Sequence, residues 1–195
     1  LVEKVGTVRF PTEYGEFLLH LYQDKFEDKQ HIALTYGKLS TNEPVLIRVH
    51  SECVTGDIFS SSRCDCGKQL EYAMKTIVEN GSGVIVYLKQ EGRGIGLKHK
   101  IKAYKLQDEG LDTVEANQEL GFPPDMRDYG TGAQILKDLK ISRLRVMTNN
   151  PKKLVGLEGH GLKIEERIKI NVSLNKENEK YLKTKAKKLG HIIEL

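Results

Sequence analysis

The spacing of hydrophobic and polar positions changes about a quarter of the way along the chain. Up to residue 50, apolar residues form short β-branched and aromatic runs with turn residues between them, a pattern typical of strands. These runs lie at 2–5, 7–10, 17–22, 31–36 and 45–49. They predict an antiparallel β layer over the first 50 residues.

From residue 51 onward, helical and strand patterns alternate. Apolar residues at helical spacing over 70–78 predict a helix that ends at Gly81, and the continuous apolar run at 83–88 predicts a strand covered on both faces. Further helices are predicted at about 98–109, at 131–140, after Pro151 and at about 176–189, with strands at 143–147 and about 162–168. Such alternation is typical of an α/β sheet that is largely parallel.

The predicted fold class is therefore α/β, with a mixed sheet, flanking helices in a three-layer α/β/α-like arrangement, and an N-terminal antiparallel β layer. No internal repeat and no Pro-, Gly- or Ser-rich linker divides the chain, and 195 residues suit one compact domain. We expect a single domain over 1–195, with a mainly β portion at 1–50 and an α/β catalytic portion at 51–195.

Composition and charge narrow the class of protein. Hydrophobic residues at 38% and charged residues at 30% are ordinary for a soluble globular chain. The net charge of +4 is too small to indicate a nucleic-acid binder, although it would not repel a polyphosphate. No apolar run is long enough to span a membrane, and the chain starts at Leu1 without a signal-peptide pattern. We expect a cytoplasmic protein with no nucleic-acid or membrane partner.

Three cysteines within a short stretch are the strongest chemical signal. Cys53, Cys64 and Cys66 have a C-x10-C-x-C spacing, and an odd number of cysteines cannot pair off into disulfides. Three thiolates suit zinc, and a catalytic zinc takes three protein ligands and leaves one position for water. The spacing therefore favours a catalytic zinc site, unless a histidine completes the set. The alternative is that these are ordinary buried or redox-active thiols.

The residues His50-Ser51-Glu52 just before Cys53 invite comparison with zinc nucleobase deaminases, which combine His-x-Glu with a later Pro-Cys-x-x-Cys. The second half of that signature is missing, because the later cysteines are spaced C-x-C and no proline precedes them. The deaminase interpretation fails, but it points to a related chemistry in which a zinc-activated water attacks a purine-like ring.

Three loop segments have the composition of phosphate-binding sites. Glycines at alternate positions in 90–98 let the backbone approach a ligand, and Arg93 and Lys98 supply charge, although the spacing matches no dinucleotide fingerprint. The segment 125–130 combines acidic, basic and aromatic groups, and 148–153 enters a helix through a proline, which predicts an anion site at exposed amides. The alternatives are a flexible turn, a solvated loop and an ordinary helix cap.

The densest basic cluster lies near the C-terminal end. Its lysines stand at positions 176, 180, 183, 185, 187 and 188, and two glutamates dilute their charge. A solvated helix face is a simpler interpretation than a nucleic-acid patch.

Several ordered motifs resemble the signature of the GTP cyclohydrolase II family, and the match runs from about Val5 to Gly190-His191. The motifs are Arg48-Val49-His50-Ser51-Glu52-Cys53-x-Thr55-Gly56-Asp57, Ser62-Arg63-Cys64-Asp65-Cys66-Gly67, Gln90-Glu91-Gly92-Arg93-Gly94-Ile95-Gly96-Leu97, Leu111-Asp112-Thr113-Val114-Glu115-Ala116-Asn117, Asp125-x-Arg127-Asp128-Tyr129-Gly130 and Thr148-Asn149-Asn150-Pro151. Two departures, His99 for an expected Asn and Thr131 for an expected Ile, lie outside the ligand positions.

The resemblance implies the first step of riboflavin biosynthesis, in which GTP is hydrolysed to formate, pyrophosphate and 2,5-diamino-6-(5-phosphoribosylamino)pyrimidin-4-one. It implies one catalytic Zn²⁺ per chain, Mg²⁺ with the triphosphate, and a homodimer. The family also occurs fused behind a dihydroxybutanone phosphate synthase domain, for which we expect no room in 195 residues.

Site residues follow from the resemblance by motif. Cys53, Cys64 and Cys66 match the zinc ligands, Asp125 the proposed proton acceptor, Arg127 the proposed nucleophile and Tyr104 a tyrosine near the reacting ring. The positions that match GTP contacts are Arg48, Val49, His50, Ser51, Glu52, Gln69, Glu91, Gly92, Arg93, Thr113, Thr148 and Lys153. Because a guanidinium stays protonated, Arg127 is more easily a charged clamp on the phosphate than a nucleophile.

Two alternative functions stay open on the sequence. One is a related cyclohydrolase that releases pyrophosphate but stops at the formamide, against which Tyr104 and the complete cysteine set argue. The other is a non-catalytic zinc module that binds nucleotides, which would require a fourth zinc ligand.

Overall fold

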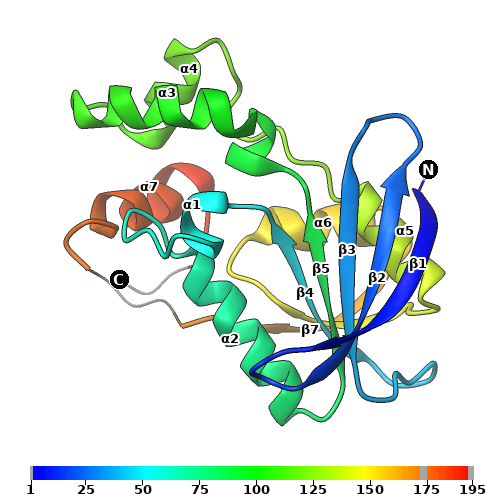
Figure 1. Cartoon of the computed structure of the whole chain (residues 1–195). Coiled ribbons are helices and arrows are strands. Elements are labelled where there is room, and N and C mark those ends of the chain that lie inside the picture. The colour runs from blue at the N-terminus through cyan, green and yellow to red at the C-terminus, as the bar shows by residue number, and fades with distance from the viewer. Residues whose placement is uncertain (1, 172–174, 193–195) are drawn as a thin grey trace. The chain divides into compact units, whose positions relative to one another are not determined.

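The structure is a computed structural model that describes residues 2–171 and 175–192, without the side chain of Lys180 (Figure 1). The chain forms two compact units. Unit 1 comprises Leu1–His50, Leu70–Lys89 and Asp128–Ile170, and unit 2 comprises Ser51–Gln69, Gln90–Arg127 and Asn171–Leu195. The prediction of a single domain over 1–195 stays a prediction.

Unit 1 is built on one seven-stranded open sheet with the strand order β1-β2-β3-β5-β4-β6-β7. The pairs β1–β2, β2–β3 and β3–β5 are antiparallel, whereas β4–β6 and β6–β7 are parallel. The strands are β1 (Val2–Pro11), β2 (Glu16–Asp24), β3 (Gln30–Tyr36), β4 (Val45–Ser51), β5 (Gly83–Leu88), β6 (Arg143–Met147) and β7 (Lys163–Ile168).

The predicted mixed α/β sheet is confirmed, and β1, β2 and β3 form an antiparallel edge of it (Figure 1). The strand β4, expected in the antiparallel N-terminal layer, instead lies inside the sheet and pairs parallel with β6. The runs at 2–5 and 7–10, predicted as two strands, belong to the single strand β1. Its pairing with β2 shifts register between Lys4 and Gly6, which is the mark of a β-bulge at the break between the two runs.

Helices cover both faces of this sheet. Alternate residues of β4 point to opposite faces, so Val45 and Ile47 join a core cluster with α5 (Gly130–Asp138) and α6 (Pro151–Glu158). Leu46 instead joins a cluster with the Leu70–Glu79 part of α2 (Cys66–Glu79). This is the three-layer arrangement that the sequence predicts.

Unit 2 contains mainly short helices. They are α1 (Val54–Asp57), the 3-10 helix η1 (Glu91–Gly94), α3 (Gly96–Asp108), α4 (Thr113–Glu119) and α7 (Glu179–Leu189), together with the first turn of α2. Contacts join α3 to η1 and to α4, and α4 to α7. The helices α1, η1 and α4 were not expected from the sequence. The start of α4 carries a capping box, in which Asp112 accepts from Val114 N and Glu115 N and the Glu115 side chain reaches back to Asp112 N.

Among the described residues, no helix is both long and apolar enough to cross a membrane.

Close backbone packing in unit 1 gives a first prediction. Gly37 has φ of +65°, and a Cβ there would lie 2.1 Å from the carbonyl oxygen of Gly81. We expect Gly37→Ala to lower the free energy of unfolding by at least about 2 kcal/mol, because the backbone strain and the collision add. In Gly6→Ala the new Cβ would meet nothing within 4 Å, so this variant is the control. Urea unfolding measures both, and equal stability of the two variants would contradict the turn geometry.

Candidate functional site

The three cysteines lie together in unit 2. Cys53 directly precedes α1, Cys64 lies in the loop before α2, and Cys66 is the first residue of α2. Their Sγ atoms all lie within 4.8 Å of one another, and those of Cys53 and Cys64 are 3.8 Å apart. Two thiolates that share one tetrahedral zinc at about 2.3 Å would be about 3.8 Å apart. The donor set and its spacing therefore fit a zinc ion, and within the described ranges the group consists of these three residues.

Two glycines permit this close approach. A Cβ on Gly56 would lie 2.8 Å from Cys64 Sγ and 3.0 Å from Cys66 Cβ. A Cβ on Gly67 would lie 2.2 Å from the carbonyl oxygen of Gly56. Any larger residue at either position would force α1 and the loop that carries the cysteines apart.

A buried lysine adjoins the sulfur cluster. The ammonium group of Lys100, on α3, donates to Cys53 Sγ at 3.2 Å, to Thr55 Oγ1 at 2.8 Å and to Glu91 Oε1 at 2.9 Å. The other carboxylate oxygen of Glu91 accepts from Val54 N at 2.7 Å. Although burial lowers the pKa of Lys100, these partners outweigh it and raise the pKa above its usual value, so the lysine stays charged.

The three thiols do not ionise equally. Hydrogen bonds from Cys64 and Cys66, helped by the charge of Lys100, lower the pKa of Cys53 far below its usual value. The hydrogen bond to Cys53 in turn raises the pKa of Cys64 to about 11. Cys53 is the intrinsic thiolate of the group, and binding of a cation by all three sulfurs would displace protons from the other two.

Tyr104 lies beside the cluster on α3. Its hydroxyl is 3.4 Å from Thr55 Oγ1, which is itself 3.6 Å from Cys53 Sγ. The guanidinium of Arg63 lies 4.6 Å from the ring centroid. Burial raises the pKa of Tyr104, so its hydroxyl keeps its proton at neutral pH.

Asp125 and Arg127 form a compact pair. Arg127 Nε donates to Asp125 Oδ1 at 2.8 Å and Nη2 donates to Oδ2 at 2.6 Å, with the two side chains only 12% and 10% exposed. Burial acts to raise the pKa of Asp125, but the hydrogen bonds and charge of Arg127 outweigh it and lower the pKa. Both groups are therefore ionised at neutral pH, and the guanidinium is oriented by a two-point contact.

Arg93 lies in η1 with φ of +61°, next to Gly92 with φ of +62°. Its atoms Nη1 and Nη2 are buried and have no hydrogen-bond partner among the described residues. Buried donors of a cation require compensation, and an anionic ligand group would supply it. The backbone carbonyl of Arg93 accepts from Met126 N at 3.1 Å, which ties η1 to the segment with Asp125 and Arg127.

The remaining candidate residues of unit 2 lie on several different elements. Ser51 ends β4 and Glu52 follows it, whereas Thr113 is the first residue of α4. Gln69, in the first turn of α2, donates from Nε2 to Asp65 Oδ2 at 2.5 Å.

Unit 1 holds the other candidate residues, on β4, just after β6 and on α6. Arg48, on β4, donates from Nη1 to the carbonyl oxygen of Met147 at 2.9 Å. Lys153, on α6, donates from Nζ to the carbonyl oxygen of Val49 at 2.8 Å. The exposed fractions of Arg48 and Lys153 are only 4% and 5%. Such deeply buried cations are suited to hold an anion.

Two further features of unit 1 belong to this group. The His50 ring stacks on Tyr87 with 5.6 Å between centroids. Thr148 Oγ1 accepts from Asn150 N at 3.0 Å, and the side chain of Asn150 caps α6, whose first residue is Pro151. The predicted helix start at Pro151 is confirmed, and an anion site there stays a prediction.

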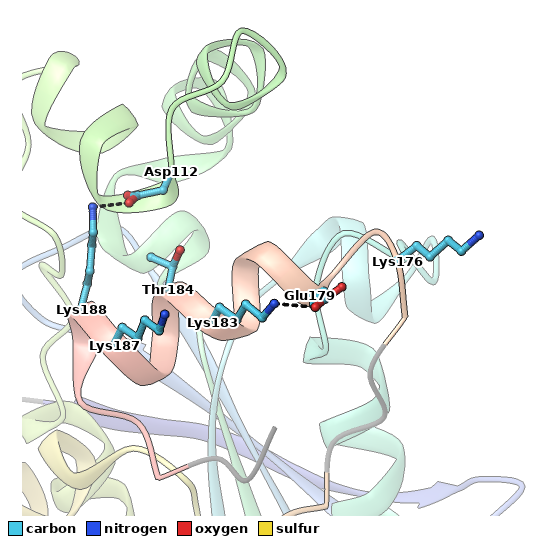
Figure 2. Close-up of a pocket in the computed structure, with 7 residues that line it drawn as sticks. All are labelled: Asp112, Lys176, Glu179, Lys183, Thr184, Lys187 and Lys188. Atoms are coloured by element: carbon cyan, nitrogen blue, oxygen red, sulfur yellow. Dashed lines mark hydrogen bonds and ion pairs between the residues drawn. The ribbon is translucent and has the colours of Figure 1, made fainter.

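The lysine-rich segment is partly as predicted. A pocket of about 450 Å³ on one side of α7 is lined by Asp112, Lys176, Glu179, Lys183, Thr184, Lys187 and Lys188 (Figure 2). Lys176, Lys183, Lys187 and Lys188 are exposed, as expected of a solvated face, and the side chain of Lys180 lies outside the described residues. For Lys185 the prediction is wrong, because this side chain is buried.

Sequence reasoning missed two buried lysines near the sulfur cluster, Lys185 and Lys100. The spacing of neighbouring residues could have indicated the position of each. Lys185 stands three residues after Leu182 and four before Leu189, on the apolar face of α7. Lys100 stands four residues before Tyr104, so helical spacing places both on one side of α3.

Comparison with known proteins identifies the family of the chain. The sequence model of the GTP cyclohydrolase II family matches residues 3–169. The chain is 55% identical over 195 residues to the riboflavin biosynthesis protein RibBA of Bacillus mycoides, covering 100% of this chain and 49% of that protein. It is 57% identical over 193 residues to RibBA of Chlorobium phaeovibrioides, covering 99% of this chain and 47% of that protein. The chain thus spans about half the length of these curated relatives.

The fold is also similar to that of a solved structure. It is the crystal structure of RibBX from A. baumannii, a two-domain 3,4-dihydroxy-2-butanone 4-phosphate synthase, with a TM-score of 0.51 and 21% identity. The similarity covers 86% of this chain and 40% of that one. At this identity it supports the fold alone.

The glycine contacts at the cluster give a second prediction. In Gly56→Ala the new methyl group would overlap Cys64 Sγ, so we expect the apparent Kd for Zn²⁺ to rise about tenfold or more. Competition with a chromophoric chelator measures it. Gly132→Ala is the control, because its Cβ would meet only ordinary contacts of 3.5 Å or more. Equal zinc affinity of the two variants would show that the sulfur cluster is not the metal site.

Proposed function

The chain belongs to the GTP cyclohydrolase II family, and on this premise we propose that it hydrolyses GTP with release of formate and pyrophosphate. The product would be 2,5-diamino-6-(5-phosphoribosylamino)pyrimidin-4-one, the first intermediate of riboflavin biosynthesis. The observation that carries the proposal is the cluster of three thiols within 4.8 Å, with the Tyr104 hydroxyl joined to it through Thr55.

The proposed metal ligands are Cys53, Cys64 and Cys66, with one zinc ion per chain. When bound, zinc supplies an activated water at neutral pH for attack on C8 of the guanine ring. Lys100 balances the negative charge of the sulfurs through its contact with Cys53, and Glu91 holds Lys100 in place. The raised pKa of Tyr104 keeps its hydroxyl proton available for a hydrogen bond to the ring as it opens.

Arg127 is proposed as a charged clamp on the α-phosphate. Its pairing with Asp125 keeps the guanidinium protonated and fixes its plane, which suits binding of a phosphate oxygen and opposes attack by nitrogen on phosphorus. Asp125 is the orienting carboxylate in this scheme. The buried Nη atoms of Arg93 support a second contact to the triphosphate.

The wider set of GTP contacts is proposed from the family motifs. The buried cations Arg48 and Lys153 support it in unit 1, and Arg93 supports it in unit 2. The complete set is Arg48, Val49, His50, Ser51, Glu52, Gln69, Glu91, Gly92, Arg93, Thr113, Thr148 and Lys153.

Three further properties are proposed on less direct grounds. Mg²⁺ would accompany the triphosphate, because it binds phosphate oxygens and waters. A homodimer follows from the family resemblance. A cytoplasmic location is supported by the three cysteines, which are all free thiols.

One assay tests the function. The protein is incubated with GTP, Zn²⁺ and Mg²⁺, and formate, pyrophosphate and the pyrimidine product are measured together. We expect the three products in equal amounts. Pyrophosphate without formate would indicate an enzyme that stops at the formamide, and binding of GTP without any product would indicate a non-catalytic module.

The two half-reactions predict different variant phenotypes. Cys66→Ser removes a metal ligand, so formate release is expected to disappear together with bound zinc. Arg127→Ala is expected to slow pyrophosphate release on the order of 10²-fold, the usual effect of losing one contact to a developing charge. Arg145→Ala is the control, because its partner Glu166 and its exposure place it on the surface of unit 1. If Arg127→Ala lowers formate release alone, the clamp is misassigned.

A further inference from the structure

Asp65 lies between two of the proposed metal ligands, Cys64 and Cys66, and directly before α2. Its backbone carbonyl accepts the first hydrogen bond of that helix, from Gln69 N at 3.0 Å. Its side chain is 2% exposed, so it carries a negative charge into the interior of unit 2. Asp65 is thus joined through the backbone to both of these cysteines.

The partner of this buried carboxylate comes from the C-terminal helix. Lys185 Nζ, on α7, donates to Asp65 Oδ1 at 2.6 Å, and Gln69 Nε2 donates to Oδ2 at 2.5 Å. Both carboxylate oxygens are therefore held. Lys185 is 8% exposed, and its ammonium group lies 4.6 Å from the centroid of the Tyr181 ring on the same helix.

Two more contacts connect α7 to proposed substrate-binding segments. Tyr181 lies 5.9 Å from the guanidinium carbon of Arg93, measured to the ring centroid. Lys188 forms an ion pair with Asp112 (Figure 2). It forms a second ion pair with Glu115, and these two partners make up the capping box at which α4 begins. Thr113, a proposed GTP contact, is the first residue of α4. These contacts all lie within unit 2, and α7 lies beyond residues 3–169, the part matched by the family model.

We propose that Lys185 is a positioning residue for the metal site, which holds the Cys64–Cys66 segment in ligand geometry through its buried ion pair with Asp65. The proposal rests on the proposed function in one respect, the assignment of zinc to the three thiols. In this proposal, α7 is the helix that fixes the position of the Cys64–Cys66 segment. Its physical basis is that removal of one partner leaves the other charge buried and uncompensated, and the loop must then move to hydrate it.

The test uses zinc itself as the probe. Lys185→Met keeps the length of the side chain and removes its charge. We expect the apparent Kd for Zn²⁺, measured by chelator competition, to rise by about 10- to 100-fold, as for loss of other residues that orient metal ligands. The thiolate-to-metal absorption of the Co²⁺-loaded variant should shift, because the sulfur positions change. Lys187→Met, an exposed change on the same helix, is the control and should bind Zn²⁺ as the unchanged chain does.

A second variant separates positioning from general loss of stability. Asp65→Asn removes the other charge, and we expect it to weaken zinc binding as well. The double variant Lys185→Met/Asp65→Asn removes both charges of the ion pair, so neither is left buried without a partner. Its apparent Kd for Zn²⁺ should therefore be no higher than that of the single variant that binds zinc more weakly. If the two effects multiply, or if Lys185→Met binds zinc like the control, the proposal is overturned. If Lys185→Met does not fold, the zinc affinities of Asp65→Asn and of the double variant are compared instead, and a further loss of affinity in the double variant would overturn the proposal.

The outcome is independent of turnover. If the protein cleaves GTP but Lys185→Met binds zinc as tightly as the unchanged chain, the positioning role alone is refuted. A chain that makes no formate, yet loses zinc affinity in Lys185→Met, would refute the proposed function and leave the positioning role intact.

Discussion

Three sulfur atoms lie within 4.8 Å of one another, and the packing and charges of unit 2 around them are adapted to this closeness. Such a cluster needs backbone segments that approach closely and cations that offset its charge. Gly56 and Gly67 provide the first, because no side chain separates α1 from the ligand loop. Lys100 provides a cation at Cys53, and Lys185 balances the carboxylate between Cys64 and Cys66. Two buried lysines from different helices therefore stabilise one small site.

The two units carry different parts of the proposed chemistry. Unit 2 combines the thiols with Tyr104 and, separately, orients Arg127 through Asp125. Unit 1 contributes the buried cations Arg48, on β4, and Lys153, on α6. In the proposed function, ring opening would depend on the thiols and Tyr104, whereas pyrophosphate release would depend on Arg127.

The sequence predicted the strands well because their apolar runs report burial in a sheet directly. It predicted the cysteine cluster because closely spaced thiols, odd in number, are typical of a metal site rather than of disulfides. The burial of Lys185 was missed because lysine composition suggested a solvated face, although Leu182 and Leu189 place position 185 on the apolar side of α7. The short helix α4 was missed because seven residues give little periodicity, although Asp112 and Glu115 form a capping box. The ion pair between Asp65 and Lys185 joins residues 120 positions apart, and a local sequence pattern cannot predict a contact over that separation.

In the proposed site, three thiolates are the complete protein ligand set of a zinc ion with one open position. X-ray absorption at the zinc edge of the loaded protein tests it most directly. We expect three sulfur atoms at about 2.3 Å and one oxygen or nitrogen atom at about 2.0 Å around each zinc. A shell of four sulfur atoms, or of two or fewer, would contradict it.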